Sequence, residues 1–308
     1  MNRFLRSMFL IALAAEAVGA QEKTVHRVVV APAETLHVSV HGRGDDVVIV
    51  PGIWSLTHAF RKVVPALVDS GFRVTIIEPL GIASSSRPPR ADYSLTAQSR
   101  RIRTVLDSLG IRRAVFVGQS LGTAMLLRLE VVSPGYLAGL VSLEGDAADQ
   151  AATPGLRRGL AMAAILFRVF PSERLMRRKL KSSMIDVSAD RSWITPATVQ
   201  AYMDPWRGRV VPTLNVYRSM ASAKETILLA DRLTTMRIPV ELMIGAAPHY
   251  GSLSPEGIRA FGRIPGAEIT NVARTGHLLH EERPEVVVAA IVRMRARAAA
   301  ARARLSPP

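Results

Sequence analysis

The stretch from residue 114 to residue 130 reads AVFVGQSLGTAMLLRLE, and it contains the strongest local signal in the chain. Its first four residues are apolar and typical of a buried strand, and the part after residue 120 is typical of a helix. Between them, residues 118–122 match the pattern Gly-x-Ser-x-Gly. A serine in a sharp strand-to-helix turn needs small residues two positions away on each side, and its hydroxyl then projects above the sheet edge. We therefore predict that Ser120 is a nucleophile.

The rest of the chain alternates between short apolar stretches and longer amphipathic ones. The apolar or alternating stretches predict strands at residues 24–31, 34–41, 46–50, 72–77, 114–117, 140–143, 239–244 and 267–272. Helices are predicted at residues 57–70, 96–109 and 121–132, each followed by glycine or proline. This alternation predicts an α/β fold with a largely parallel sheet that helices cover on both faces. In such sheets ligands bind at the carboxyl ends of the strands.

The strand pattern stops between residues 147 and 237, where only helical segments are expected. We interpret this segment as a helical cap, inserted into a core of residues 21–146 and 238–300. A basic tail at residues 301–308 is expected to be disordered. A cap of this kind excludes water from a site and shapes the choice of substrate.

The first twenty residues differ from the rest of the chain. A basic start with Arg3 and Arg6 is followed by a short apolar run and by Val18-Gly19-Ala20 before Gln21. This is the pattern of a cleavable signal peptide, so we expect a periplasmic or secreted protein; an uncleaved amphipathic anchor is the alternative. The chain has no cysteine, which excludes disulfides, thiol catalysis and thiolate metal sites.

Positive charge is in excess, with 40 Lys and Arg against 25 Asp and Glu. The excess concentrates at residues 157–158, 174–181 and 293–304. No nucleic-acid motif and no interleaved aromatic residues accompany these runs, so we expect a solvated basic surface and no nucleic-acid partner. A weak contact between the basic cap and a membrane surface is the alternative. The expected partner is a small-molecule substrate.

The order of the elements, the Gly-x-Ser-x-Gly turn and the sequence GHLLHEERPE at residues 276–285 resemble the α/β-hydrolase superfamily. The resemblance covers nearly all of the chain after Gln21. It implies that Ser120 needs a general base, and His277, in the loop after the last strand, is the candidate. His280 is expected to be structural or to lie at the rim of the site, whereas His249 is not easily dismissed.

The acid that should orient the histidine is displaced from its usual place. In most members of the superfamily it follows the strand that corresponds here to residues 240–245, but the next loop, AAPHYGS, contains no carboxylate. A group that includes haloalkane dehalogenases places the acid after the preceding strand, where this chain has Glu144 and Asp146. We predict Glu144 as the acid, with Asp146 and Glu256 as alternatives. A carboxylate that only caps the start of the cap domain is the remaining explanation for Glu144.

Backbone amides that stabilise an oxyanion are implied at two places. One is the amide of Leu121, directly after the serine. The other is the amide of Ile53, because Pro51-Gly52-Ile53 stands where relatives often have His-Gly-x. Trp54 and Gln119 are expected to line the substrate pocket.

The resemblance implies a serine hydrolase that cleaves an ester or a related acyl bond of a small to medium apolar substrate through an acyl-enzyme. No metal and no organic cofactor are implied. Dehalogenase and epoxide-hydrolase chemistry are disfavoured, because those relatives carry an aspartate where this chain has Ser120. Hydrolysis of a C–C bond or a lactone, and perhydrolysis, remain alternatives, as does a non-catalytic binding protein of the same fold.

Overall fold

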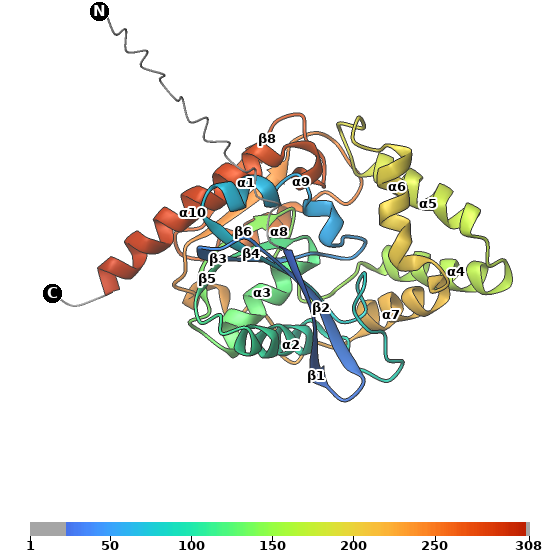
Figure 1. The fold of residues 1–308 in the computed structure, drawn as a ribbon, viewed down its shortest axis with the longest axis horizontal. Helices are drawn as coiled ribbons and strands as arrows, with labels where there is room; N and C mark the ends of the chain where they lie inside the picture. The colour runs from blue at the N-terminus through green and yellow to red at the C-terminus, as the bar shows by residue number, and fades with distance from the viewer. Residues whose placement is uncertain (1–22, 306–308) are drawn as a thin grey trace, which may run out of the picture.

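The computed structural model describes residues 23–305, and its centre is one eight-stranded sheet (Figure 1). The signal peptide predicted at residues 1–20 lies outside the described residues. The predicted strands are all present, with the order β1-β2-β4-β3-β5-β6-β7-β8 across the sheet. Their bounds are β1 Lys23–Ala31, β2 Glu34–His41, β3 Asp45–Val50, β4 Phe72–Glu78, β5 Ala114–Gln119, β6 Leu137–Leu143, β7 Val240–Gly245 and β8 Glu268–Val272.

The sheet is mostly parallel. β1 and β2 form an antiparallel hairpin, and β2 pairs antiparallel with β4, whereas every pair from β4 to β8 is parallel. All six residues of β5 and of β7 are buried, as is typical of strands that are covered on both faces. Because β3, β5, β6 and β7 run in the same direction, the loops that follow them meet at one edge of the sheet.

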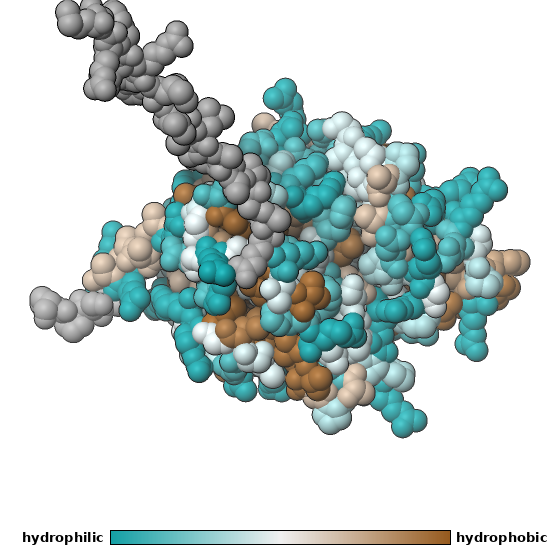
Figure 2. Space-filling model, viewed as in Figure 1, coloured by the Kyte–Doolittle hydropathy of each residue, from teal (hydrophilic) through white to brown (hydrophobic). Residues whose placement is uncertain are grey.

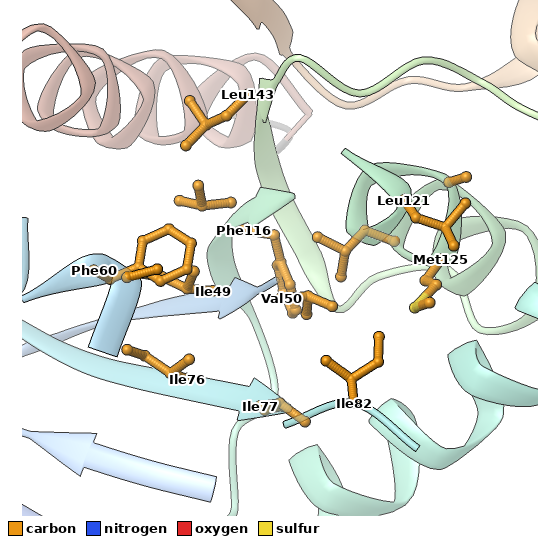
Figure 3. Close-up of a cluster of buried hydrophobic side chains, with 14 of the residues drawn as sticks. Ile49, Val50, Phe60, Ile76, Ile77, Ile82, Phe116, Leu121, Met125 and Leu143 are labelled. Carbon is orange, nitrogen blue, oxygen red and sulfur yellow. The ribbon is translucent and has the colours of Figure 1, made fainter. Parts of the chain in front are cut away.

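Helices cover both faces of the sheet. In Figure 1, α1 and α10 lie over one face and α2 and α3 over the other. The bounds of the core helices are α1 Val64–Asp69, α2 Leu95–Ser108, α3 Leu121–Val132, α8 Pro255–Phe261, α9 Leu279–Glu282 and α10 Pro284–Leu305. Figure 3 shows part of the core between them, where Ile49 and Ile76 of the sheet lie near Phe60, and Leu121 and Met125 project from α3.

Two expectations about helices were wrong. The single helix predicted at residues 57–70 is a 3₁₀ turn, η1 (Thr57–Phe60), followed by α1. Pro65 lies in the first turn of α1, where its missing N–H costs nothing, but it would break a helix that continued through it. The tail that was expected to be disordered from residue 301 continues α10 as far as Leu305. Residues 306–308 lie outside the described part.

Residues 147–237 contain helices and no strand. They are α4 Pro154–Val169, α5 Glu173–Asp186, α6 Pro196–Met203, η2 Asp204–Trp206, α7 Val210–Ser222 and η3 Leu233–Thr235. The chain leaves the carboxyl end of β6 to enter this segment, and α4 to α7 gather at one side of the sheet (Figure 1). Within the described residues, no helix is both long and apolar enough to cross a membrane.

Candidate active site

Ser120 occupies the turn between β5 and α3 in a strained backbone conformation. Its φ of 50° and ψ of −122° are values that a non-glycine residue rarely adopts. The turn leaves no room for a side chain two positions before or two positions after the serine. A Cβ at Gly122 would lie 2.1 Å from the carbonyl oxygen of Val50, and one at Gly118 would lie 2.6 Å from Thr123 Cα. The two glycines are therefore required by close packing against β3 and the start of α3.

A buried polar network holds this turn against β6. Thr123 Oγ1 donates to the Gly118 carbonyl at 3.0 Å and lies 2.9 Å from Ser142 Oγ. Ser142 Oγ in turn donates to the carbonyl of Gly145 at 2.6 Å. Thr123 and Ser142 are both fully buried, so these hydrogen bonds satisfy groups that would otherwise be costly to bury. The network ties the serine turn to the segment that carries Glu144.

Glu144 follows directly after β6, also with a positive φ, and its side chain is buried. Its Oε1 accepts a hydrogen bond from the amide of Gly245 at 2.6 Å. Its Oε2 lies 3.7 Å from His277 Nδ1 and 3.6 Å from His249 Nε2, which are ion-pair rather than hydrogen-bond distances. Burial alone would raise the pKa of Glu144, but the two imidazoles and the Gly245 amide outweigh it and lower the pKa below the ordinary value.

His249 shares this carboxylate with His277. Its Nδ1 lies 2.7 Å from the carbonyl oxygen of Ala247, and because a carbonyl only accepts, Nδ1 carries a hydrogen. The neighbouring Glu144 carboxylate raises the pKa of His249 above its ordinary value, since it stabilises the imidazolium. His249 had no predicted role. The signal in the sequence was its place in the loop after β7, where the superfamily usually has its acid.

The backbone around His277 is fixed by contacts with the cap. The His277 amide donates to the carbonyl of Val187, at the end of α5, at 2.8 Å. Glu282, which is buried, accepts from the amides of Gly276 at 3.1 Å and Ala189 at 3.0 Å. The carboxylate of Glu282 therefore holds the histidine loop to the cap, a positioning role that the sequence pattern did not reveal.

Gln119 connects the serine turn, the histidine and the loop after β3. Its Oε1 accepts from the amide of Gly52 at 2.9 Å, and its Nε2 lies 3.4 Å from His277 Nε2. A Cβ at Gly52 would lie 2.9 Å from Ser120 Cβ, so the loop after β3 packs directly against the serine. Among the residues that the structure describes, none accepts a hydrogen bond from the amide of Ile53, the next residue in this loop.

The amide of Leu121 also donates to no described residue. It is the first residue of α3, so its N–H has no partner within the helix, and no other described residue accepts from it. Within residues 23–305, no hydrogen bond joins Ser120 Oγ to His277, and Gln119 is the side chain that links their neighbourhoods. The structure thus brings together Ser120, Gln119, His277 and Glu144, with two unpaired amides from the segments that flank the serine.

An apolar cavity of about 490 Å³ lies between the loop after β3 and the cap. Trp54 lines it and is held in place by the cap, because its ring stacks on Trp206 at 4.8 Å and meets the edge of Tyr217. Gln119, which was expected beside Trp54 in the pocket, does not line this cavity. The other lining residues are mostly apolar and come from α4, α5 and α7: Gly159, Met162, Ala163, Leu166, Phe167, Met176, Lys179, Leu180, Ser183 and Leu214.

The alternative acids and the second histidine of the GHLLH stretch lie in other environments. Glu256 is exposed and pairs with Arg259 at 2.7 Å. Burial raises the pKa of Asp146, and no described residue other than Glu144 forms a carboxylate pair with His277 within 4 Å. His280 is fully buried and stacked on Phe60, and burial lowers its pKa to about 3, so it is neutral.

Three unpartnered atoms converge beside the serine. Glu144 Oε2, His249 Nε2 and His277 Nδ1 are buried without a hydrogen-bond partner among the described residues, and they lie within 4.8 Å of one another. One carboxylate and two imidazoles form a donor set that could hold Zn²⁺ or Fe²⁺. The same geometry also fits a carboxylate that steadies two histidines without a metal.

Comparisons with known proteins agree with the fold. Residues 46–197 match the family model described as alpha/beta hydrolase fold. A 2-hydroxy-6-oxononadienedioate/2-hydroxy-6-oxononatrienedioate hydrolase from Pseudomonas sp is 29% identical over 251 residues, which are 79% of this chain and 85% of that protein.

Two solved structures have the same fold. The epoxide hydrolase CorEH without ligand superimposes with a TM-score of 0.73 at 17% identity, covering 89% of this chain and 99% of its own. The haloalkane dehalogenase DbeA from Bradyrhizobium elkani USDA94 gives a TM-score of 0.69 at 21% identity, with the same coverage of 89% and 99%. At these identities the two structures establish the fold and carry no information about the reaction.

Proposed function

The chain belongs to the α/β-hydrolase superfamily, and from this premise we propose that it is a serine hydrolase that cleaves an ester or a related acyl bond of a small to medium apolar substrate. One observation carries the proposal. Ser120 is held at a positive φ in the turn before α3, and the Nε2 of its neighbour Gln119 lies 3.4 Å from a histidine, His277, whose Nδ1 faces a buried carboxylate at 3.7 Å. A serine is a weak nucleophile by itself, and this surrounding is what activates it.

The reaction would proceed through an acyl-enzyme. Ser120 Oγ attacks the acyl carbon while His277 Nε2 accepts its proton, and the amides of Ile53 and Leu121 stabilise the oxyanion. Collapse of the tetrahedral intermediate breaks the bond to the leaving group, which takes the proton from His277. A water molecule then attacks the acyl-enzyme by the same route and releases the acid and the free serine.

Glu144 would act on His277 rather than on the substrate. Its carboxylate keeps the hydrogen of the neutral imidazole on Nδ1, so that Nε2 is free to accept the proton of the serine. It also stabilises the imidazolium that forms. Gln119 supports the same tautomer, because its amide nitrogen is a donor and faces His277 Nε2 at 3.4 Å.

The cavity favours a neutral, apolar acyl group. Its lining is aromatic and aliphatic apart from Lys179 and Ser183, and a volume of about 490 Å³ is within the range of small-molecule pockets. An anionic substrate would need more compensating positive charge inside the cavity. The cap that closes over Trp54 would keep water away from the bond to be cleaved.

Hydrolysis of a C–C bond is the second candidate, and the relative from Pseudomonas sp favours it. The compound in the name of that relative carries two carboxylates and a ketone and has no ester, so its hydrolysis breaks a C–C bond. The same serine, histidine and amides could serve that reaction. A dianionic substrate agrees poorly with a cavity that Lys179 alone supplies with positive charge, which is why ester cleavage is preferred.

Kinetics on chromogenic esters of increasing acyl length test the proposal. We expect ester hydrolysis by the wild-type protein and a fall of kcat by at least about a thousandfold in both Ser120→Ala and His277→Ala, because the two residues act as a unit. Circular dichroism would check that the variants fold. Comparable activity in Ser120→Ala would refute the serine mechanism. Activity on a dienedioate but on no ester would favour the second candidate, and no activity on either would favour a binding protein.

A further inference from the structure

Helix α4 exposes an apolar stripe to solvent. Met162, Ile165, Leu166 and Val169 follow helical spacing, and Phe170 continues the stripe at the end of the helix. Their exposed fractions range from 38% to 72%. The buried residues of α4 (Leu160, Ala164 and Phe167) lie on the opposite side of the helix and already fill the cap core. The stripe is therefore a second apolar face that the cap does not need for its own stability.

Unpaired positive charge surrounds this stripe. Residues 154–186, which comprise α4, α5 and the loop between them, carry eight Arg or Lys against two acidic residues. None of the eight forms an ion pair with another residue in the described part of the chain. In Figure 2, hydrophobic residues in brown and tan lie among teal ones at the right-hand edge, where Figure 1 places α4 and α5. The basic residues are Arg157, Arg158, Arg168, Arg174, Arg177, Arg178, Lys179 and Lys181.

The stripe is continuous with the apolar cavity. Met162 and Leu166 belong to both, and Lys179 of α5 lines the same cavity. The cavity extends from these residues to Trp54, which directly follows Ile53 in the loop after β3. A molecule bound against α4 would thus lie beside a cavity that Trp54 also lines.

We propose that the surface formed by α4 and α5, with its apolar stripe and its eight cations, docks on an anionic lipid bilayer and that the cavity receives acyl substrates from that bilayer. Apolar residues would enter the region between headgroups and acyl chains, while the basic residues contact anionic headgroups. Charge complementarity decides the occupant. A second copy of this chain would place two strongly basic surfaces against each other, and like charges in an interface are costly.

Docking itself does not depend on the proposed reaction, whereas the delivery of substrate rests on it. The two parts are therefore tested separately. The Ser120→Ala protein serves for docking, so that hydrolysis of lipid cannot alter the vesicles during the measurement.

A site-specific fluorescent label provides the first test, because the chain contains no native cysteine. In the Ser120→Ala background, Ile165→Cys is labelled with an environment-sensitive dye, and Val29→Cys is the control. Val29 is 69% exposed, close to the 64% of Ile165, but it lies on β1, outside the docking surface. We expect the emission of the label at residue 165 to shift to the blue with vesicles of phosphatidylglycerol and phosphatidylcholine, and the label at residue 29 to stay unchanged. Equal shifts at both positions, or no shift at residue 165, would overturn the proposal.

Sedimentation with the same vesicles provides the second test. The paired substitution Ile165→Glu and Phe170→Glu should lower the partition coefficient of the protein between vesicles and water by about tenfold or more. Val29→Glu should leave this coefficient unchanged. Pure phosphatidylcholine vesicles and high salt should also weaken binding, since both remove the electrostatic attraction. Unchanged sedimentation of the paired variant would contradict the proposal. The proposal would also be contradicted if the parent protein did not bind vesicles but formed a concentration-dependent dimer that the paired substitution abolished. That result would assign the surface to self-association.

Substrate delivery is tested with the active protein. A long-chain ester presented in anionic vesicles should be hydrolysed at least about tenfold more slowly by the paired variant, while a soluble short-chain ester should be hydrolysed at the wild-type rate. Equal loss on both esters would refute delivery from the bilayer and would indicate damage to the cap. If the wild-type protein hydrolyses neither ester, the proposed reaction fails, and the label and sedimentation results still decide the docking.

Discussion

Replacing Glu144 by glutamine tests the displaced acid. The Oε1 of Glu144 accepts from the Gly245 amide at 2.6 Å, and in a glutamine only the carbonyl oxygen can keep this bond. The new NH₂ group must therefore take the place of Oε2, which lies 3.7 Å from His277 Nδ1. As a donor, it favours the imidazole tautomer that carries its hydrogen on Nε2. That tautomer cannot accept the proton of Ser120.

The expected loss of turnover rate follows from this change of tautomer. A correctly placed amide in the position of a triad carboxylate lowers the rate by up to about ten-thousandfold. Because the carboxylate of Glu144 lies beyond hydrogen-bond distance and also serves His249, the lower bound is about a hundredfold. At 1.36 kcal/mol per decade, this range corresponds to about 2.7–5.4 kcal/mol of transition-state stabilisation. KM should change little, since Glu144 is buried behind His277 and does not line the substrate cavity.

The assay is steady-state hydrolysis of a chromogenic ester, with an unfolding curve to confirm that the variant is folded. Glu256→Gln is the matched control, because Glu256 is exposed and its carboxylate pairs with Arg259 of its own helix. We expect its kcat to stay within about twofold of wild type. A folded Glu144→Gln protein with kcat within about threefold of wild type would refute the role of Glu144 as the acid.

Four further outcomes are expected. The Glu144 carboxylate raises the pKa of His249 in the folded protein. The stabilising contribution of His249 is therefore complete below about pH 6.5, its unfolded pKa, and is lost as the pH rises through the higher folded pKa. In urea unfolding, the difference in the free energy of unfolding between wild type and His249→Gln should shrink as the pH is raised. Dialysis against EDTA should leave kcat unchanged, and a loss that Zn²⁺ restores would instead assign the carboxylate and the two imidazoles to a metal centre. Arg128→Ala should lower the free energy of unfolding by about 3–5 kcal/mol, because it removes the ion-pair partner of the buried Glu225 carboxylate, whereas Arg103→Ala at an exposed pair should cost less than about 1 kcal/mol. Protein recovered from the native host should begin at Gln21 by intact mass, and a mass that includes Met1 would reject cleavage of a signal peptide.

Local patterns made the fold and part of the site predictable. The strand before Ser120, the glycines around it and the helix after it lie within seventeen consecutive residues, so a short stretch of sequence contains the whole turn. The strands could be identified because apolar runs of this length have few alternatives in a chain that alternates between strands and helices. The choice of Glu144 rested on the resemblance to the group that includes haloalkane dehalogenases, which places the acid after this strand, because the loop after β7 contains no carboxylate.

The contacts that were missed join segments far apart in the chain. His249 and His277 meet one carboxylate because the loops after β6, β7 and β8 converge at the edge of the sheet, and no short pattern records that convergence. Glu282 holds the His277 loop to a cap segment 93 residues away, and Gln119 reaches Gly52 across 67 residues. The break before α1 was a different kind of error, because Pro65 was present in the sequence and its effect on the preceding turn was not taken into account.

Covalent labelling with a fluorophosphonate, read by intact mass and peptide mapping, tests the central claim most directly. Only an activated serine reacts quickly with this probe, whatever the natural substrate is. We predict one adduct per chain, located on Ser120, absent in Ser120→Ala and formed far more slowly in His277→Ala. An unlabelled wild-type protein, or an adduct at another residue that persists in Ser120→Ala, would contradict the account.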